Sequence, residues 1–364
     1  MEIGIVGLPQ AGKRTLFDLL TSTYHTEILP RKGAKTPDLG MSKVYDDRLD
    51  RLAKLYNPEK VIPAAITYIM LPRLSKTSDD NQDAFKAIQN VDAICHVVRA
   101  HSDESVFHID GSVDPGRDIE FLESEFILHD SIFTEHRIAR LDKDIKIKND
   151  PLLIKERELM VRINDQLNKE IPLRLITFTE DEEKVLNAYP YLSRKNMLVV
   201  LNADEDAVNE EEGQFQDLLT ACEAKGIHSM LVSAKIEKEL AELTDEEERR
   251  QFLESLGITR SALEKMTQLS YRACDRISFF TVGEDEVRAW TVRRFACAPE
   301  AGGAVHSDIE RGFIRAEHMR VEDILTLGSE AAVKEAGKFS LKGKTYEVCD
   351  GDILHFRFSV DKKK

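Results

Sequence analysis

The chain has 364 residues, enough for two or three domains whose cores need no disulfide or metal support. Hydrophobic residues make up 42% and charged residues 32%, a soluble composition that excludes a fibre or a disordered chain. The formal net charge is −15 and falls almost entirely before residue 277, so the N-terminal part is not expected to grip nucleic acid broadly. Residues 277–364 are nearly neutral, which leaves room for a local basic patch.

The first residues and the cysteines indicate a reduced, cytoplasmic environment. Glu2 and the lack of an apolar segment after it argue against a signal peptide. No apolar run approaches the roughly 18 residues of a membrane span. The five cysteines are scattered without a Cys-x-x-Cys pair, so reduced thiols are favoured over a zinc site or a disulfide framework. We expect a cytoplasmic protein with no membrane partner.

Short apolar runs alternate with helical patterns through much of the chain. The runs that predict strands lie at 2–6, 65–71, 93–98, 197–201 and 229–232. Helical patterns at 83–89 and 214–225 separate some of them. Strands that alternate with helices predict an α/β domain with a mainly parallel sheet, covered on both faces.

The alternation stops after about residue 117. Apolar residues near helical spacing run from Ile119 to Ile145 and again from Leu152 to Leu167, on either side of Asn149-Asp150-Pro151. Asn-Asp-Pro is a turn followed by a helix-starting proline. The pattern predicts an antiparallel helical hairpin inserted into the sheet domain. Two core helices of that domain are the alternative, which the length and high charge of both segments disfavour.

A small α+β domain is predicted from about residue 277. Strand-like runs at 287–292, 346–348 and 353–360 are separated by glycine-containing turns, and one helical stretch lies at 321–327. The predicted division is 1–117 with 190–276 for the sheet domain, 118–189 for the helical insertion and 277–364 for the last domain.

Residues 7–13 (GLPQAGK) follow a predicted strand and precede a helix, the context that a phosphate-binding loop requires. Its glycines let backbone N–H groups converge on phosphate oxygens at a helix N-terminus. Lys13 would reach the β- and γ-phosphates. A plain strand-to-helix turn is the alternative, and the lysine at the required place disfavours it.

The position after the lysine departs from this motif. A Ser or Thr hydroxyl there ligates Mg²⁺, but this chain has Arg14, and Thr15 comes one residue too late. An arginine has a permanent charge and no acceptor, so it cannot bind a cation. Arg14 either lies against a phosphate or pairs with an acidic neighbour and closes an empty site, and the sequence leaves both open.

Along its whole length the chain resembles the Obg-like ATPase (YchF) subfamily of P-loop GTPases. The resemblance is densest near the C-terminus, at 283–291 (GEDEVRAWT), 312–317 (GFIRAE) and 334–338 (KEAGK). Residues 47–50 (DRLD) and 91–99 match in the nucleotide domain. The resemblance implies a TRAFAC GTPase-like P-loop domain, an inserted helical, coiled-coil-like domain and a C-terminal TGS-like α+β domain.

The resemblance extends to the elements that read the base. The family has Asn-x-x-Glu and prefers ATP, where ordinary GTPases have Asn-Lys-x-Asp; here 202–205 reads NADE. Ser233-Ala234-Lys235 resembles the loop that closes over the base. The implied nucleotide-binding residues are Pro9, Gln10, Ala11, Gly12, Lys13, Arg14, Thr15, Asn202, Ala203, Glu205, Ser233 and Ala234.

The magnesium and switch positions do not match the family. Its metal ligands fall at Arg14, Ala34 and Met70, so no metal ligand is assigned. Arg73 replaces the switch glycine, whose N–H senses the γ-phosphate. Leu74 agrees with the hydrophobic residue that the family has in place of a catalytic glutamine. No residue is therefore assigned as catalytic.

Two functions remain open from the sequence. One is a regulatory protein that binds ATP or ADP, with GTP second, hydrolyses them weakly or not at all, and does not depend on Mg²⁺. The resemblance implies a ribosomal or RNA partner for it, through the TGS-like and helical domains. The other is a slow ATPase or GTPase that uses K⁺ and Arg14 in place of the missing ligands. The trio Arg14, Ala34 and Met70 favours the first.

A second surface stays ambiguous. Five arginines and two aromatic residues of the last domain either form an RNA-binding face or belong to a solvated β surface. They are Arg293, Arg294, Arg311, Arg315 and Arg320 with Phe295 and Phe313. His306 and Asp308 have a metal-like spacing, but the resemblance places them in a turn.

Overall fold

The computed structural model describes residues 1–21, 38–76, 81–103, 105–209, 213–243, 245–258 and 261–359. Two compact units divide the chain, one from Met1–Met41 with Thr67–Met266 and the other from Ser42–Ile66 with Thr267–Lys364. The chain thus leaves the first unit after Met41, contributes a segment to the second, and returns. The sequence does not indicate this excursion, and the three-part division above stays a prediction.

The first unit is built on a sheet that, in the described residues, has six strands in the order β2-β4-β1-β5-β6-β7. These are β1 (Glu2–Val6), β2 (Leu39–Lys43), β4 (Ala65–Met70), β5 (Ala93–Arg99), β6 (Asn196–Asn202) and β7 (His228–Val232). The pairs β4–β1, β1–β5, β5–β6 and β6–β7 are all parallel. The predicted parallel sheet is confirmed, and β2 is the strand that the sequence does not predict.

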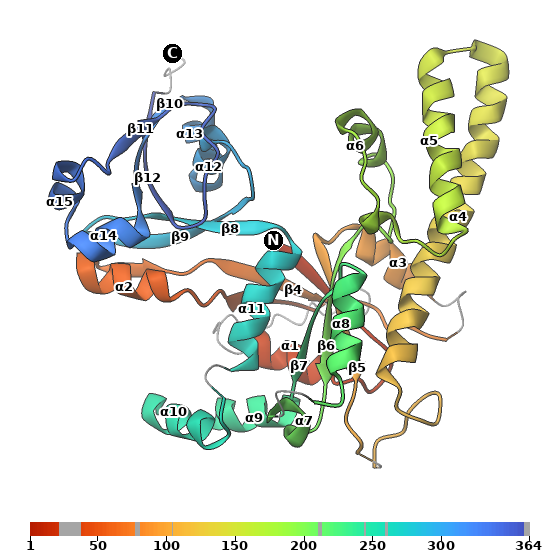
Figure 1. The fold of residues 1–364 in the computed structure, drawn as a ribbon, viewed down its shortest axis with the longest axis horizontal. Helices are drawn as coiled ribbons and strands as arrows, with labels where there is room; N and C mark the ends of the chain where they lie inside the picture. Colours follow the sequence, from red (N-terminus) through yellow and green to blue (C-terminus); the bar gives the residue numbers. More distant parts are fainter. Residues whose placement is uncertain are drawn as a thin grey trace. The chain divides into compact units, whose positions relative to one another are not determined.

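Helices cover this sheet (Figure 1). The helices in this part of the chain include α1 (Lys13–Thr21), α3 (Gln82–Gln89), α7 (Glu205–Asn209), α8 (Gln216–Ala224), α9 (Ala234–Glu242), α10 (Glu246–Ser255) and α11 (Ala262–Ala273). Strand β5 is buried along its whole length, as its apolar sequence requires. Phe85 of α3, Phe126 of the following long helix and Val199 of β6 belong to one core.

The predicted helical hairpin is confirmed. It consists of α4 (Pro115–Lys148) and α5 (Pro151–Leu167), which lie side by side in Figure 1. Asn149 ends α4 in the left-handed conformation, and the Asp150 carboxylate accepts from the Leu152 amide to start α5. Leu141 and Met160 are fully buried between the helices. A 3-10 turn (Leu173–Leu175) and α6 (Glu180–Leu186) then lead back to β6.

The second unit has its own six-stranded sheet among the described residues, in the order β11-β10-β12-β8-β9-β3. Its strands are β3 (Lys60–Ile62), β8 (Arg276–Thr281), β9 (Glu286–Arg293), β10 (Phe313–Arg320), β11 (Ser340–Lys342) and β12 (Asp352–Phe358). Its helices are α2 (Asp47–Tyr56), α12 (Ala298–Val305), α13 (Ser307–Arg311), α14 (Val321–Leu327) and α15 (Glu330–Glu335). This is the predicted α+β organisation, with the predicted helix at 321–327.

Two expectations for this unit are corrected. The strand predicted at 346–348 is wrong, because only Glu347 forms an isolated bridge, with Cys297. Residues 47–50, assigned above to the nucleotide domain, open α2 in the second unit, where Arg48 contacts Asp350 at 2.7 Å. In the first case the pattern covers only three residues, too few to distinguish a strand from an isolated bridge. In the second, the contact joins residues about three hundred positions apart, which no local pattern reveals.

Candidate functional site

The loop between β1 and α1 depends on two glycines. Gly7 and Gly12 have φ values of 150° and 93°. A Cβ atom on Gly7 would lie 2.2 Å from the Val97 carbonyl oxygen, and one on Gly12 would lie 2.4 Å from Asn202 Nδ2. Only glycine therefore allows the loop to pack this closely against the ends of β5 and β6. Between them, Pro9 is half-buried, Gln10 is exposed with φ 62° and Ala11 is buried.

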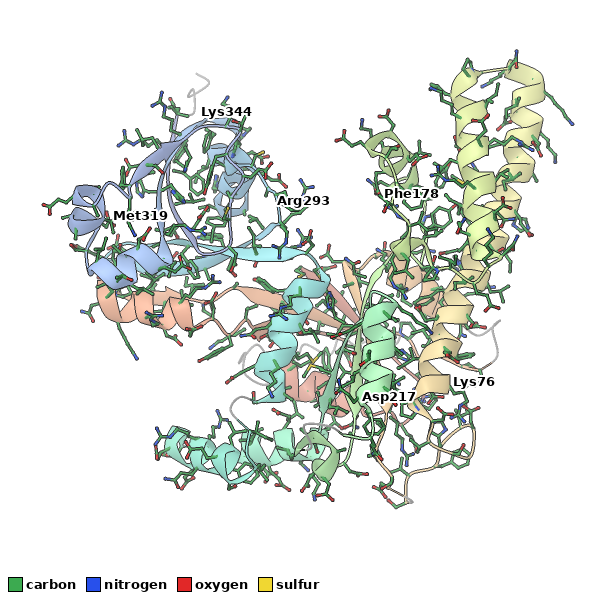
Figure 2. All side chains as sticks on the ribbon, in the orientation of Figure 1. Lys76, Phe178, Asp217, Arg293, Met319 and Lys344 are labelled. Atoms are coloured by element: carbon green, nitrogen blue, oxygen red, sulfur yellow. The ribbon has the colours of Figure 1, made fainter. Side chains whose placement is uncertain are left out.

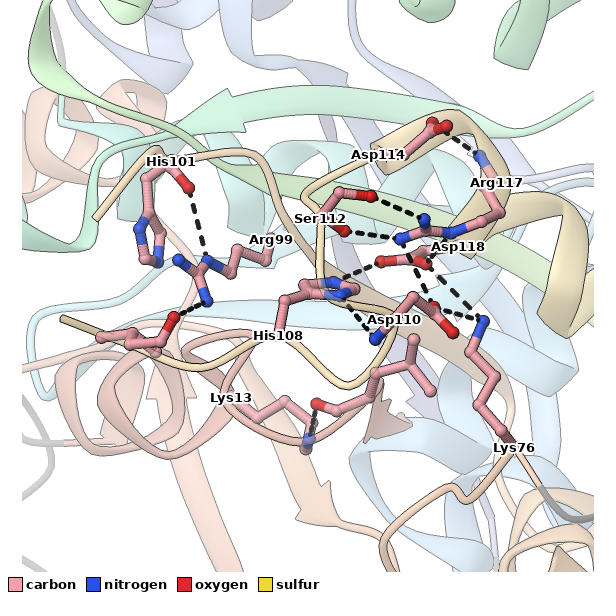
Figure 3. Close-up of polar contacts among 12 residues, drawn as sticks. Lys13, Lys76, Arg99, His101, His108, Asp110, Ser112, Asp114, Arg117 and Asp118 are labelled. Atoms are coloured by element: carbon pink, nitrogen blue, oxygen red, sulfur yellow. Dashed lines mark hydrogen bonds and ion pairs between the residues drawn. The ribbon is translucent and has the colours of Figure 1, made fainter. Parts of the chain in front are cut away.

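Lys13, the first residue of α1, folds back over this loop. Its Nζ atom donates to the carbonyl oxygens of Gly7 at 2.7 Å and Leu8 at 2.5 Å. Figure 3 draws Lys13 with one of these contacts. Burial, and then the positive charge of Arg73, lowers the pKa of Lys13 to about 8. The ammonium is therefore held within the curve of the loop and partly withdrawn from water.

Asn202 ties three of the predicted segments together. Its Nδ2 atom donates to the Ala11 carbonyl at 3.3 Å, and its Oδ1 atom accepts from the Ala234 amide at 3.2 Å. Next to it, the Ala203 amide donates to the Val232 carbonyl. Because β1, β6 and β7 are parallel, their carboxyl ends meet at one edge of the sheet. This brings the loop at 9–15, residues 202–205 and residues 233–234 to one place.

The residues predicted to contact the base have polar partners of their own. Glu205 opens α7, and its Oε1 atom lies 2.6 Å from Nζ of Lys235. Ser233 caps α9 through the Ile236 amide. Asp204 accepts from both the amide and the hydroxyl of Ser102 at 2.9 Å. Sequence reasoning singled out Glu205 but not the anchoring role of Asp204, although the two are adjacent.

Arg14 pairs with acidic neighbours, one of the two alternatives left open above. Its guanidinium contacts Asp18 at 2.9 Å and Asp38 at 2.5 Å. Burial would lower the pKa of Arg14, but the hydrogen bonds and charges of these two carboxylates raise it overall. Met70, at the end of β4, donates its amide to the Asp38 carbonyl at 2.9 Å. Thr15 is exposed, and Ala34 lies outside the described residues.

Two further groups beside the loop were not predicted from the sequence. Arg73 is exposed and near enough to Lys13 for its charge to lower the pKa of that lysine. His96 is buried in β5, and its Nδ1 atom has no partner in the described part of the chain. Burial, followed by the charge of Lys13, lowers the pKa of His96 to about 3, so the ring is neutral. His96 stands in a mostly apolar strand, and this is the sequence signal that could have identified it.

The segment that follows β5 folds beside the phosphate loop. Arg99 donates to the carbonyls of Val106 at 2.7 Å and Asp103 at 2.6 Å, which fixes its first turn. His108 then contacts Asp118 of α4 at 3.1 Å, as Figure 3 shows. A narrow hollow lies between the phosphate loop and this segment. It is lined by Leu8, Pro9, Ala11, His96, Val97, Val98, Arg99, His108 and Asp118. The start of the hairpin is thus anchored next to the loop.

Neither a metal cluster nor a membrane helix is found in the described ranges. No three His, Cys, Asp or Glu side chains there are grouped as metal ligands would be. No helix within those ranges has the length and apolar character needed to cross a membrane.

A phosphate loop after the first strand of a parallel sheet, with two further loops at the same edge, defines a P-loop protein of the GTPase fold. Residues 276–359 match the family model YchF-GTPase_C, a protein of unknown function (DUF933). The chain belongs to the YchF (Obg-like ATPase) family. This confirms the resemblance and the fold described from the sequence.

Two sequence relatives and one solved structure support the family assignment. The chain is 41% identical to the ribosome-binding ATPase YchF of Bacillus subtilis, covering 99% of this chain and 100% of that protein. It is 34% identical to Obg-like ATPase 1 of Caenorhabditis elegans, covering 99% and 92%. The solved structure of the Schizosaccharomyces pombe YchF GTPase superposes with a TM-score of 0.86 at 29% identity, covering 98% of this chain and 97% of that one.

Proposed function

We propose that this chain is a ribosome-associated protein that binds purine nucleotides, prefers ATP or ADP to GTP, and hydrolyses them weakly or not at all. The observation that carries the proposal is an intact phosphate loop with Lys13, next to an Arg14 that is tied to two carboxylates. Relatives named ribosome-binding ATPase and Obg-like ATPase support the nucleotide and the ribosome as partners.

The residues at the family's metal positions do not fit Mg²⁺. A cation there would face the guanidinium of Arg14 and the thioether of Met70, neither of which is a hard oxygen ligand. Binding of the nucleotide should therefore depend little on Mg²⁺. The alternative, a slow ATPase or GTPase that uses Arg14 against the phosphates, is disfavoured because Asp18 and Asp38 already engage that guanidinium.

The proposed base preference rests on Glu205. Adenine offers its N6 amino group as a donor, where guanine offers the acceptor O6. Glu205 can accept from that amino group, and the Asn-x-x-Glu pattern at 202–205 is the one that the ATP-preferring family carries. Lys235 now contacts Glu205, but the lysine side chain is 72% exposed, so breaking that pair costs little.

Calorimetric titration with ATP, ADP and GTP, each with Mg²⁺ and with EDTA, tests the proposal. We expect ATP and ADP to bind more tightly than GTP and to bind equally well in EDTA, because Lys13 and the loop amides supply the phosphate contacts. The Lys13→Ala variant is the control and should bind none of them measurably. Tighter binding of GTP, or binding that needs Mg²⁺, would contradict the base preference or the metal independence, respectively.

Affinity for nucleotide should fall as the pH rises above about 8, the pKa of Lys13 in the free protein. Phosphate binding requires the protonated ammonium, so above this pH each binding event must also take up a proton. The dissociation constant should then rise by up to about tenfold per pH unit. Titrations between pH 7 and 9.5 measure this. In Lys13→Ala any residual binding should not vary with pH, and a flat profile in the unmodified protein would show that Lys13 does not contact the phosphates.

The tip of the α4–α5 hairpin is the surface we propose for the ribosome. Lys143, Lys146 and Lys148 are exposed there, and none forms an ion pair within the described residues. Ile147 and Leu152 are 79% and 74% exposed beside them. Figure 2 shows the side chains at this end projecting outward from both helices. Unpaired lysines around exposed apolar side chains suit ribosomal RNA.

The arginines of the second unit are a weaker candidate for RNA. Arg293, Arg294, Arg311 and Arg320 each contact a carboxylate, those of Glu300, Asp275, Asp308 and Asp352. Phe313, moreover, is buried in the core of that unit. Most of this basic character is neutralised within the fold, which favours the solvated-surface alternative for these residues.

A further inference from the structure

The chain after β4 leaves the sheet beside the phosphate loop. Strands β1 and β4 are parallel, with Ile5 paired to Met70, and the Leu71 amide still donates to the Ile5 carbonyl at 3.1 Å. Gly7 begins the phosphate loop two residues after Ile5. Arg73 likewise comes two residues after Leu71, the residue whose amide bonds to Ile5.

The backbone around Arg73 is fixed while its side chain is exposed. Leu71 and Leu74 on either side are buried, at 4% and 2% exposure, in the same core as Val6 and Leu8. Arg73 itself stands on the surface between these two anchors. Its guanidinium is therefore carried by a segment that buried side chains hold on both sides.

The surroundings of Arg73 have an unusual balance of charge. Arg73 is close enough to the ammonium of Lys13, a group of the same sign, for its charge to lower the pKa of that lysine. Within the described residues Arg73 contacts no carboxylate, and His96, which also feels the charge of Lys13, is neutral. Two cations that lie near each other without a counter-charge among these residues are the arrangement expected where an anion binds. Arg14 differs, because Asp18 and Asp38 satisfy it.

We propose that Arg73 is a phosphate ligand, whose guanidinium holds the terminal phosphate of a bound nucleoside triphosphate together with Lys13. The inference rests on the proposed nucleotide-binding function. In it, the Arg73 guanidinium supplies positive charge to the phosphates in place of a metal ion. A guanidinium presents a planar fork that binds two phosphate oxygens at once. The ligand of this site is then a metal-free nucleotide, and Arg73 gives preference to three phosphates over two.

The test is calorimetric titration in EDTA with ATP and ADP, using Arg73→Gln and, as the matched control, Arg140→Gln. Both substitutions remove one exposed guanidinium, but Arg140 lies toward the C-terminal end of α4 and not in the nucleotide site. Arg73→Gln should weaken ATP binding by about 10- to 100-fold, the effect of losing hydrogen bonds to a charged group, and ADP binding by much less. Arg140→Gln should leave the affinities for ATP and ADP within about twofold of the unmodified protein. Arg73→Lys should recover part of the ATP affinity, since it restores the charge without the fork.

The possible results distinguish a failure of the role proposed for Arg73 from a failure of the proposed nucleotide-binding function. Melting temperatures without nucleotide should match for all variants, because Arg73 and Arg140 are exposed. Arg73→Lys covers the case in which the glutamine variant folds poorly. If Arg73→Gln binds ATP as the unmodified protein does, while Lys13→Ala does not bind, the role of Arg73 is overturned and the proposed function stands. If the unmodified protein binds neither nucleotide, both are overturned.

Discussion

Phosphate release from ATP should proceed at the same background rate in the unmodified protein and in Lys13→Ala. Phosphoryl transfer relies on a metal ion and fixed charges to neutralise the transferring group. Arg14 is bound to Asp18 and Asp38, and the Met70 side chain has no oxygen atom. Neither side chain can therefore hold that metal ion. Losing several kcal/mol of such stabilisation lowers the rate by at least about a thousandfold, at 1.36 kcal/mol per factor of ten. A steady-state phosphate assay with K⁺ and Mg²⁺ measures it.

Restoring the family's residues provides the control for this prediction. Arg14→Ser alone should not rescue turnover, because the other ligand positions stay empty. Arg14→Ser, Ala34→Thr, Met70→Asp and Arg73→Gly together rebuild the metal ligands and the switch glycine, and should raise turnover above the background. Multiple turnovers in the unmodified protein that disappear in Lys13→Ala would show that the site hydrolyses nucleotide without the usual ligands.

The sequence predicted those parts of the fold whose signals are local. The parallel strands of the first unit are continuous apolar runs, and the hairpin is marked by Asn149-Asp150-Pro151 at its turn. Strand β2 escaped prediction because Gly40 and Ser42 interrupt its apolar pattern. Strand β10 escaped because charged residues such as Arg315 and Glu317 alternate with its buried side chains. Its fit to the sheet depends on pairing with β12, which is distant in sequence.

The candidate site shows the same limit. The phosphate loop and Asn202 follow predicted strands, and parallel strands end at one edge, so their meeting was predictable. The ion pair of Arg14 with Asp38 was not predictable, because Asp38 lies 24 residues away and comes close only through the pairing of β2 with β4. Arg73 looked only like a lost glycine. Its closeness to Lys13 follows from the register of β1 against β4, which no local pattern contains.

Replacing the three lysines at the hairpin tip should weaken binding to ribosomes strongly. The change is Lys143→Gln, Lys146→Gln and Lys148→Gln, all at exposed positions in the last turns of α4, so the helix should remain intact. Each lysine that neutralises a phosphate contributes roughly 0.7–0.9 to the slope of log affinity against log salt, so the slope should fall by about 2–3. Co-sedimentation with ribosomes across a series of salt concentrations gives both the affinity and the slope.

A matched variant separates this local effect from a change in net charge. Lys54, Lys86 and Lys238 are also exposed but lie on α2, α3 and α9, none of which is part of the hairpin. Replacing these three by glutamine removes the same charge from the chain, and we expect the slope to stay within about one unit of the unmodified protein. Equal losses in the two triple variants would mean that overall charge governs binding. An unchanged affinity in the tip variant would overturn the proposed role of Lys143, Lys146 and Lys148 in the ribosome contact.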